Sequence, residues 1–139
     1  MSERRPLHVV PGELLPPRDP ERRHLLSVRD LDRADVERLL ATAHSFALSQ
    51  ERDTKKLPTL RGRLVVNAFF ESSTRTSSSF ELAAKRLSAD TLSIKASGSS
   101  IEKGESLKDT ALTLSAYDPD VIVIRHPQIG APQLVASVT

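Results

Sequence analysis

Apolar runs of strand length alternate with helical segments through the second half of the chain, and this order limits the fold more than any other feature. The expected strands are 64–70, 91–94 and 121–124, and the expected helices between them are 76–87 and 105–117. Strands separated by helices pair in parallel through right-handed crossovers. The pattern therefore predicts the α/β class with a doubly wound parallel sheet.

The apolar residues of these segments predict how they are buried. In the helix 76–87 we expect four residues at helical spacing to face inward: Phe80, Ala83, Ala84 and Leu87. The strand 121–124 is uniformly β-branched, which is typical of a strand that is buried on both faces. Residues 133–138 predict the first turns of another helix, and a sheet that ended there would leave an edge uncovered. We therefore expect the 139 residues to be part of a larger protein.

Two different segments precede the alternating region. Apolar residues at three- and four-residue spacing predict an amphipathic helix that Asp30 or Asp32 can cap. These apolar residues are Val36, Leu39, Leu40, Ala43, Phe46 and Ala47. Residues 1–23 contain five of the nine prolines, so we expect a flexible or extended tail there. The remaining residues, 24–139, are expected to form one domain.

Composition excludes several classes of protein. The formal net charge is only +2, and four Phe and one Tyr are too few to offer a stacking surface for bases. No apolar stretch approaches the roughly 18 residues of a membrane span. Cysteine is absent, which excludes disulfides and thiolate metal sites and is compatible with a reducing cytoplasm. We expect neither a nucleic-acid partner nor a membrane, and a location in the cytoplasm.

A run of donors follows the first expected strand. Ser73, Thr74, Arg75 and Thr76 stand where a helix should begin. Unpaired N–H groups and the helix dipole favour an anion at such a turn, and the guanidinium of Arg75 matches a phosphate. A simple run of capping residues is the alternative. The two glycine-rich nucleotide motifs, G-x-x-x-x-G-K-[ST] and G-x-G-x-x-G, do not occur, which disfavours nucleotide chemistry.

Polar residues also follow the other two strands, and the carboxyl ends of parallel strands share one edge of a sheet. A Ser/Gly-rich loop covers 95–103, and Arg125-His126-Pro127 follows the third strand. By composition the loop reads as a solvated connection, but Lys103 opposes the dipole of the helix that it precedes. An anion nearby would explain that lysine. Arg125 reads equally as a surface residue or as a ligand of the same anion, and His126 as a structural residue rather than a base.

Several of these motifs resemble a known family. Phe69-Phe70-Glu71 with Ser73–Thr76 and Ser79-Phe80-Glu81 is similar to the carbamoyltransferase signature. Lys103-Gly104-Glu105-Ser106 and Arg125-His126-Pro127 resemble the aspartate carbamoyltransferase family in particular. The resemblance runs from about His24 to the last residue. It implies that carbamoyl phosphate and L-aspartate react to give N-carbamoyl-L-aspartate and phosphate, in pyrimidine biosynthesis, with no metal or cofactor.

The resemblance also implies roles for individual residues. The phosphate would be held by Ser73, Thr74, Arg75 and Thr76, and Arg75 would also neutralise the leaving group. Thr76 and Arg125 would reach the carbonyl oxygen, and Arg125 the phosphate as well. Ser99 and Lys103 would belong to a loop that enters the site of a neighbouring subunit, so the implied catalytic unit is a homotrimer with shared active sites. Glu71 would help to lock two domains together.

The chain also departs from the family pattern. Ser77 stands where a basic residue is common, and Glu102 places a negative charge beside Lys103. The family's His-Pro-x-Gln segment and its aspartate-binding domain would lie beyond Thr139. The first hypothesis is therefore the carbamoyl phosphate-binding part of an aspartate carbamoyltransferase, inactive alone. The alternative is a non-catalytic protein that binds phosphate metabolites or pairs with full-length subunits as an assembly or regulatory partner.

Overall fold

The structure is a computed structural model that describes residues 23–95 and 106–139. The described residues divide into two compact units, with the boundary between Lys55 and Lys56. The tail that we expect at 1–23 lies outside the described residues except for its last residue, as does the Ser/Gly-rich loop except for Lys95.

The first unit contains a short 3-10 helix, η1 (Val28–Asp30), and the helix α1 (Arg33–Ser49). Asp32 caps α1, because its Oδ1 accepts the Asp35 N–H at 2.7 Å while the Asp35 carboxylate accepts the Asp32 N–H at 3.2 Å. This reciprocal capping box confirms the helix expected in this region and selects Asp32 over Asp30 as its cap.

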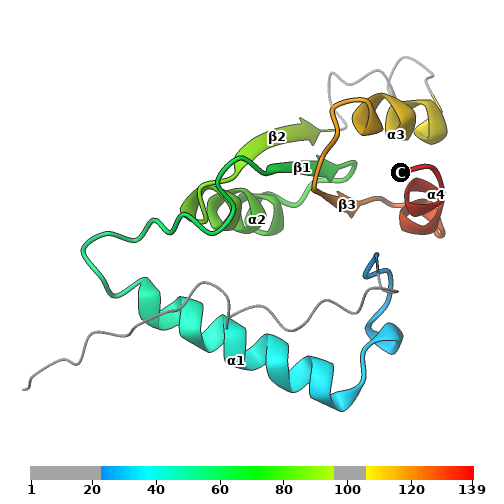
Figure 1. The fold of residues 1–139 in the computed structure, drawn as a ribbon. Coiled ribbons are helices and arrows are strands. Elements are labelled where there is room, and N and C mark those ends of the chain that lie inside the picture. Colours follow the sequence, from blue (N-terminus) through cyan, green and yellow to red (C-terminus); the bar gives the residue numbers. More distant parts are fainter. Residues whose placement is uncertain (1–22, 96–105) are drawn as a thin grey trace, which may run out of the picture. The chain divides into compact units, whose positions relative to one another are not determined.

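The second unit alternates strands and helices, as Figure 1 shows. In chain order its elements are β1 (Leu64–Phe69), α2 (Thr74–Arg86), β2 (Asp90–Lys95), α3 (Leu107–Ser115), β3 (Val121–Arg125) and α4 (Ala131–Val138). The α2 helix begins two residues earlier than expected, so most of the donor run lies inside its first turn. Helix α4 confirms the helix expected near the end of the sequence.

The three strands form one parallel sheet in the order β2-β1-β3. Phe69 is in register with Lys95 on one side and with Arg125 on the other, so all three strands end along the same edge. The chain crosses from β2 over β1 to reach β3, which is the crossover pattern of a doubly wound fold. The predicted fold class is confirmed.

Helices cover the two faces of the sheet unequally. On one face Val66, Ala68 and Phe70 form the core with Leu114 of α3, and the pairing of α3 with α4 extends this layer (Figure 1). On the other face α2 packs against β1 and β2, and the rings of Phe69 and Phe80 lie 6.5 Å apart between centroids. The central strand β1 is therefore buried along almost its whole length.

One expectation about burial is wrong, and another holds only for Ala84 and, in part, for Leu87. Strand β3 is not buried on both faces: Val121 is 46% exposed, and the other residues of the strand are at most partly buried. The reason is that β3 lies at an edge of the sheet, whereas α2 packs against β1 and β2. On α2 only Ala84 is fully buried, whereas Phe80 is 45% exposed and Ala83 is exposed, because the narrow sheet covers only part of this helix.

Hydrogen bonds and an ion pair of Asp120 join the amino ends of β1 and β3. The Asp120 carboxylate accepts the Leu64 N–H at 2.9 Å and pairs with the Arg63 guanidinium at 2.7 Å. The Asp120 N–H in turn donates to the Leu64 carbonyl at 3.0 Å. The bond from the Leu64 N–H, followed by that from Arg63, lowers the pKa of Asp120 below its usual value. These bonds accompany the register in which Phe69 and Arg125 lie side by side at the opposite ends of the two strands.

Candidate functional site

The candidate site begins at the turn between β1 and α2. Ser73 is the N-cap residue of α2, yet its side chain makes no capping hydrogen bond. Its hydroxyl instead accepts a hydrogen bond of 3.0 Å from Nη1 of Arg125. The donor run is therefore more than a set of capping residues, because its first hydroxyl is directed to another strand.

Arg125 is the last residue of β3 and lies beside this turn. Its backbone carbonyl accepts the Phe70 N–H at 2.8 Å, which extends the strand pairing by one bond. Its guanidinium also pairs through Nε with the Glu71 carboxylate, and both side chains are partly exposed. The structure thus brings Ser73 and Arg125 together, as the sequence predicts, and adds Glu71 as an anionic partner.

The other donors of the run occupy the first turn of α2. Thr74 and Arg75 are exposed and Thr76 is half-buried. The first N–H groups of a helix have no partner within it, so this turn presents backbone donors beside the Arg75 guanidinium. Ser99 and Lys103 lie in the segment 96–105, outside the described residues, so their place near this turn stays a prediction.

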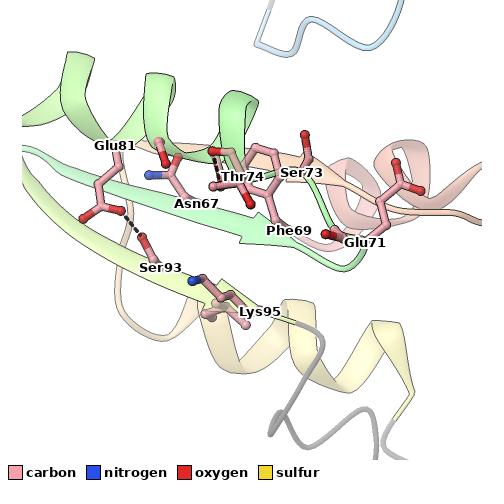
Figure 2. Close-up of a pocket in the computed structure, with 12 residues that line it drawn as sticks. Asn67, Phe69, Glu71, Ser73, Thr74, Glu81, Ser93 and Lys95 are labelled. Carbon is pink, nitrogen blue, oxygen red and sulfur yellow. Dashed lines mark hydrogen bonds between the residues drawn. The ribbon is translucent and has the colours of Figure 1, made fainter.

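A pocket of about 450 Å³ opens beside the same turn. It lies between the first half of α2 and the carboxyl halves of β1 and β2, as Figure 2 shows. The turn contributes Glu71, Ser73 and Thr74, and the sheet contributes Asn67 and Lys95. Arg75, Thr76 and Arg125 do not line this pocket. The donors of the site are therefore divided between the pocket and the adjoining edge of the sheet.

The floor of the pocket contains a polar side chain in an apolar strand. Asn67 is 2% exposed, and neither atom of its amide has a hydrogen-bond partner in the structure. Farther along α2, Glu81 pairs with Lys85 at 2.6 Å. Glu81 also accepts a bond of 3.4 Å from Ser93 of β2, as Figure 2 shows. The bond from Lys85 is the largest cause of the lowered pKa of Glu81, so this carboxyl is ionised at neutral pH.

Sequence reasoning missed the residues that line the pocket along β1 and β2. Asn67 interrupts an otherwise apolar run, and that interruption was the available signal. Ser93 and Lys95 alternate along β2 and so share a face of the sheet, but the sequence does not show that α2 lies over that face. No local signal relates these residues to the donor run.

The arrangement suits a small phosphate-bearing ligand. Neutral hydroxyls, backbone N–H groups and guanidinium donors all stabilise oxyanions, and guanidinium can bind a phosphate through two parallel bonds. Among the described residues no cluster of three or more acidic, histidine or cysteine side chains offers a metal site. Nor do the helices of the described ranges include one that is long and apolar enough to cross a bilayer.

The fold and this turn define a doubly wound α/β protein with a candidate anion site at the carboxyl edge of its sheet. Residues 23–139 match the family model described as the carbamoyl-P binding domain of aspartate/ornithine carbamoyltransferase. Because this match covers most of the sequence, the chain belongs to that family.

Individual relatives agree with the family assignment. The chain is 61% identical over 114 residues to the aspartate carbamoyltransferase catalytic subunit of Kineococcus radiotolerans. This alignment covers 82% of this chain and 36% of that protein. It is 60% identical over 116 residues to the corresponding subunit of Streptomyces griseus, covering 84% of this chain and 35% of the relative. The chain therefore spans about a third of the length of these relatives.

Solved structures show the same similarity. Aspartate transcarbamoylase from Trypanosoma cruzi, in complex with carbamoyl phosphate and aspartate, superposes with a TM-score of 0.74 at 38% identity. That alignment covers 82% of this chain and 35% of the other. The catalytic subunit of M. jannaschii aspartate transcarbamoylase gives a TM-score of 0.74 at 36% identity, covering 85% of this chain and 38% of the other.

Proposed function

We propose that this chain supplies the carbamoyl phosphate-binding part of an aspartate carbamoyltransferase. The observation that carries the proposal is the hydrogen bond between Arg125 and Ser73, which joins the donor turn to the end of β3. The curated relatives named above are catalytic subunits of this enzyme, and one solved relative is in complex with carbamoyl phosphate and aspartate.

In the proposed reaction the amine of L-aspartate attacks the carbonyl carbon of carbamoyl phosphate. A C–N bond forms, the C–O bond to phosphate breaks, and the proton lost by the amine passes to the departing phosphate or to water, giving N-carbamoyl-L-aspartate and phosphate. The phosphate is bound by Ser73, Thr74, Arg75, Thr76 and Arg125. Thr76 and Arg125 also stabilise the oxyanion that develops on the carbonyl. Placing donors where charge develops, and holding both reactants in position, lowers the barrier without a covalent intermediate.

The remaining functional assignments follow from the family and belong to the same proposal. Ser99 and Lys103 complete the site of a neighbouring subunit in a cytoplasmic homotrimer, and Glu71 helps to hold two domains closed. L-aspartate binds mostly through residues that this chain does not contain. The enzyme made from the whole subunit serves pyrimidine biosynthesis.

Isothermal titration of the chain with carbamoyl phosphate tests the binding site. Arg125→Ala should weaken binding about tenfold or more, because a charge-assisted hydrogen bond is worth about 1.5–3 kcal/mol. Arg61→Ala is the matched control, because Arg61 is exposed and precedes β1 at the opposite edge of the sheet. Equal affinity in the two variants would contradict the proposed site.

The intact mass of the protein purified from its source cells tests the catalytic part of the proposal. A mass well above 15.3 kDa, with carbamoyl transfer to aspartate, is expected for the complete transferase. A mass near 15.3 kDa, with binding but no turnover, would favour the non-catalytic alternative.

A further inference from the structure

The side chain that follows Arg125 folds back onto the sheet. The imidazole of His126 lies against the ring of Phe70, with centroids 5.3 Å apart and planes inclined by 60°. Its Nδ1 accepts the Gln128 N–H at 3.0 Å. Pro127, between them, has no N–H and a restricted φ. A single imidazole therefore contacts both the core and the turn that leaves β3.

The same two rings border the ion pair of the candidate site. Phe70 directly precedes Glu71, and His126 directly follows Arg125. The backbone bond from Phe70 N–H to the Arg125 carbonyl, at 2.8 Å, joins the two segments at this point. The backbone bond and the ring contact lie next to the two charged residues. They therefore restrict the backbone positions of Glu71 and Arg125.

We propose that His126 is a positioning residue for Arg125. Its Nδ1 fixes the turn after β3, so that the guanidinium stays beside Ser73 and Glu71. Because Nδ1 accepts the Gln128 N–H, the contribution of His126 at this atom is that of a hydrogen-bond acceptor. This inference rests on the proposed carbamoyl phosphate site, because His126 acts on the ligand only through Arg125.

Two substitutions separate the hydrogen bond from the ring contact. His126→Asn keeps an acceptor for the N–H two residues on, as asparagine does in Asx turns, but it loses the ring. His126→Phe keeps a ring against Phe70 but has no acceptor. We expect His126→Phe to weaken carbamoyl phosphate binding about fivefold, the effect of one lost neutral hydrogen bond. His126→Asn should bind carbamoyl phosphate within about twofold of the wild-type affinity, but it should unfold at a lower urea concentration. The reverse order of affinities would overturn the proposal.

A double-mutant cycle tests whether the effect passes through Arg125. In the Arg125→Ala background, His126→Phe should change the Kd by less than about twofold, because the guanidinium that His126 positions is absent. A full fivefold loss in that background would show that His126 acts independently, and would overturn the inference.

The wild-type chain provides a test that does not depend on variants folding. The ¹⁵N chemical shifts of His126 at neutral pH should show an unprotonated Nδ1 and a protonated Nε2. The opposite tautomer would mean that the bond to Gln128 does not form, and would overturn the inference. The proposed function fails separately: it fails when Arg125→Ala binds like wild type, whereas the inference alone fails when Arg125→Ala weakens binding and His126→Phe does not.

Discussion

Arg125 and Ser73 are 52 positions apart in the sequence, and a hydrogen bond of 3.0 Å joins the guanidinium of one to the hydroxyl of the other. The same guanidinium donates to the Glu71 carboxylate. Side chains of the chain itself therefore hold Arg125 beside the donor turn, and one of them is an anion. A phosphate that binds Arg125 competes with the Glu71 carboxylate for the same donors.

Glu71→Gln should strengthen the binding of inorganic phosphate to the chain. We expect roughly fivefold tighter binding, because one charge at about 4 Å in water-like surroundings is worth about 1 kcal/mol. Titration calorimetry at low salt measures the change. Asp90→Asn is the matched control, since Asp90 is exposed at the amino end of β2. Weaker binding in Glu71→Gln would mean that the carboxylate supports Arg125 instead of competing with the ligand.

Arg75→Ala should separate binding from stability. Loss of a charge-assisted phosphate contact should weaken carbamoyl phosphate binding by about 10- to 150-fold, equivalent to 1.5–3 kcal/mol. The chain should become more stable to urea by about 0.3–1 kcal/mol, because Arg75 is a cation in the first turn of α2. Unchanged affinity would remove Arg75 from the site. In a complete transferase the same substitution should abolish turnover.

Asp120→Asn should destabilise the chain near neutral pH. The lowered pKa of Asp120 means that its carboxylate binds a proton more weakly in the folded than in the unfolded chain. The stability that this carboxylate contributes is therefore complete above about pH 5. It is lost as the pH falls through the pKa of Asp120 in the folded chain, which lies below 3.8. Urea unfolding should show a lower midpoint for the variant at pH 7, with the two proteins converging in acid. A constant difference at all pH values would contradict this account.

Asn67→Val should stabilise the chain. Both amide atoms of Asn67 are buried without partners, and burying an unpaired polar group costs about 1–3 kcal/mol. Valine suits a central strand, and we expect a gain of about 1–2 kcal/mol in the free energy of unfolding. Phosphate binding at the turn should change less than about twofold, since a neutral group has been exchanged. A loss of stability would show that the amide has a partner in solution.

Much of the local structure could be predicted from the sequence. The apolar runs and helical spacings identify all three strands and the helices between them, with shifts of one or two residues at most ends. Asp32 marks the start of α1 because its capping box involves only neighbouring residues, and Ser73 stands at the N-cap position of α2.

The burial of individual side chains could not be predicted as well. Phe80 has the spacing of an inward residue, and Val121 has the composition of a buried strand, but both are nearly half exposed. Periodicity indicates which residues share a face. How much of that face is covered depends on the width of the sheet and on the order of its strands.

The sequence by itself determined the alternation of strands and helices, the donor run that begins α2, and the motifs that relate the chain to its family. Only the tertiary structure decided that Ser73 bonds to Arg125, that Glu71 shares that guanidinium, and that the His126 ring lies tilted against the Phe70 ring. These partners come from segments more than fifty residues apart. Their pairing depends on the register between β1 and β3. Local sequence does not encode this register, because the register arises only when the chain crosses from β2 over β1 and the ends of the strands meet.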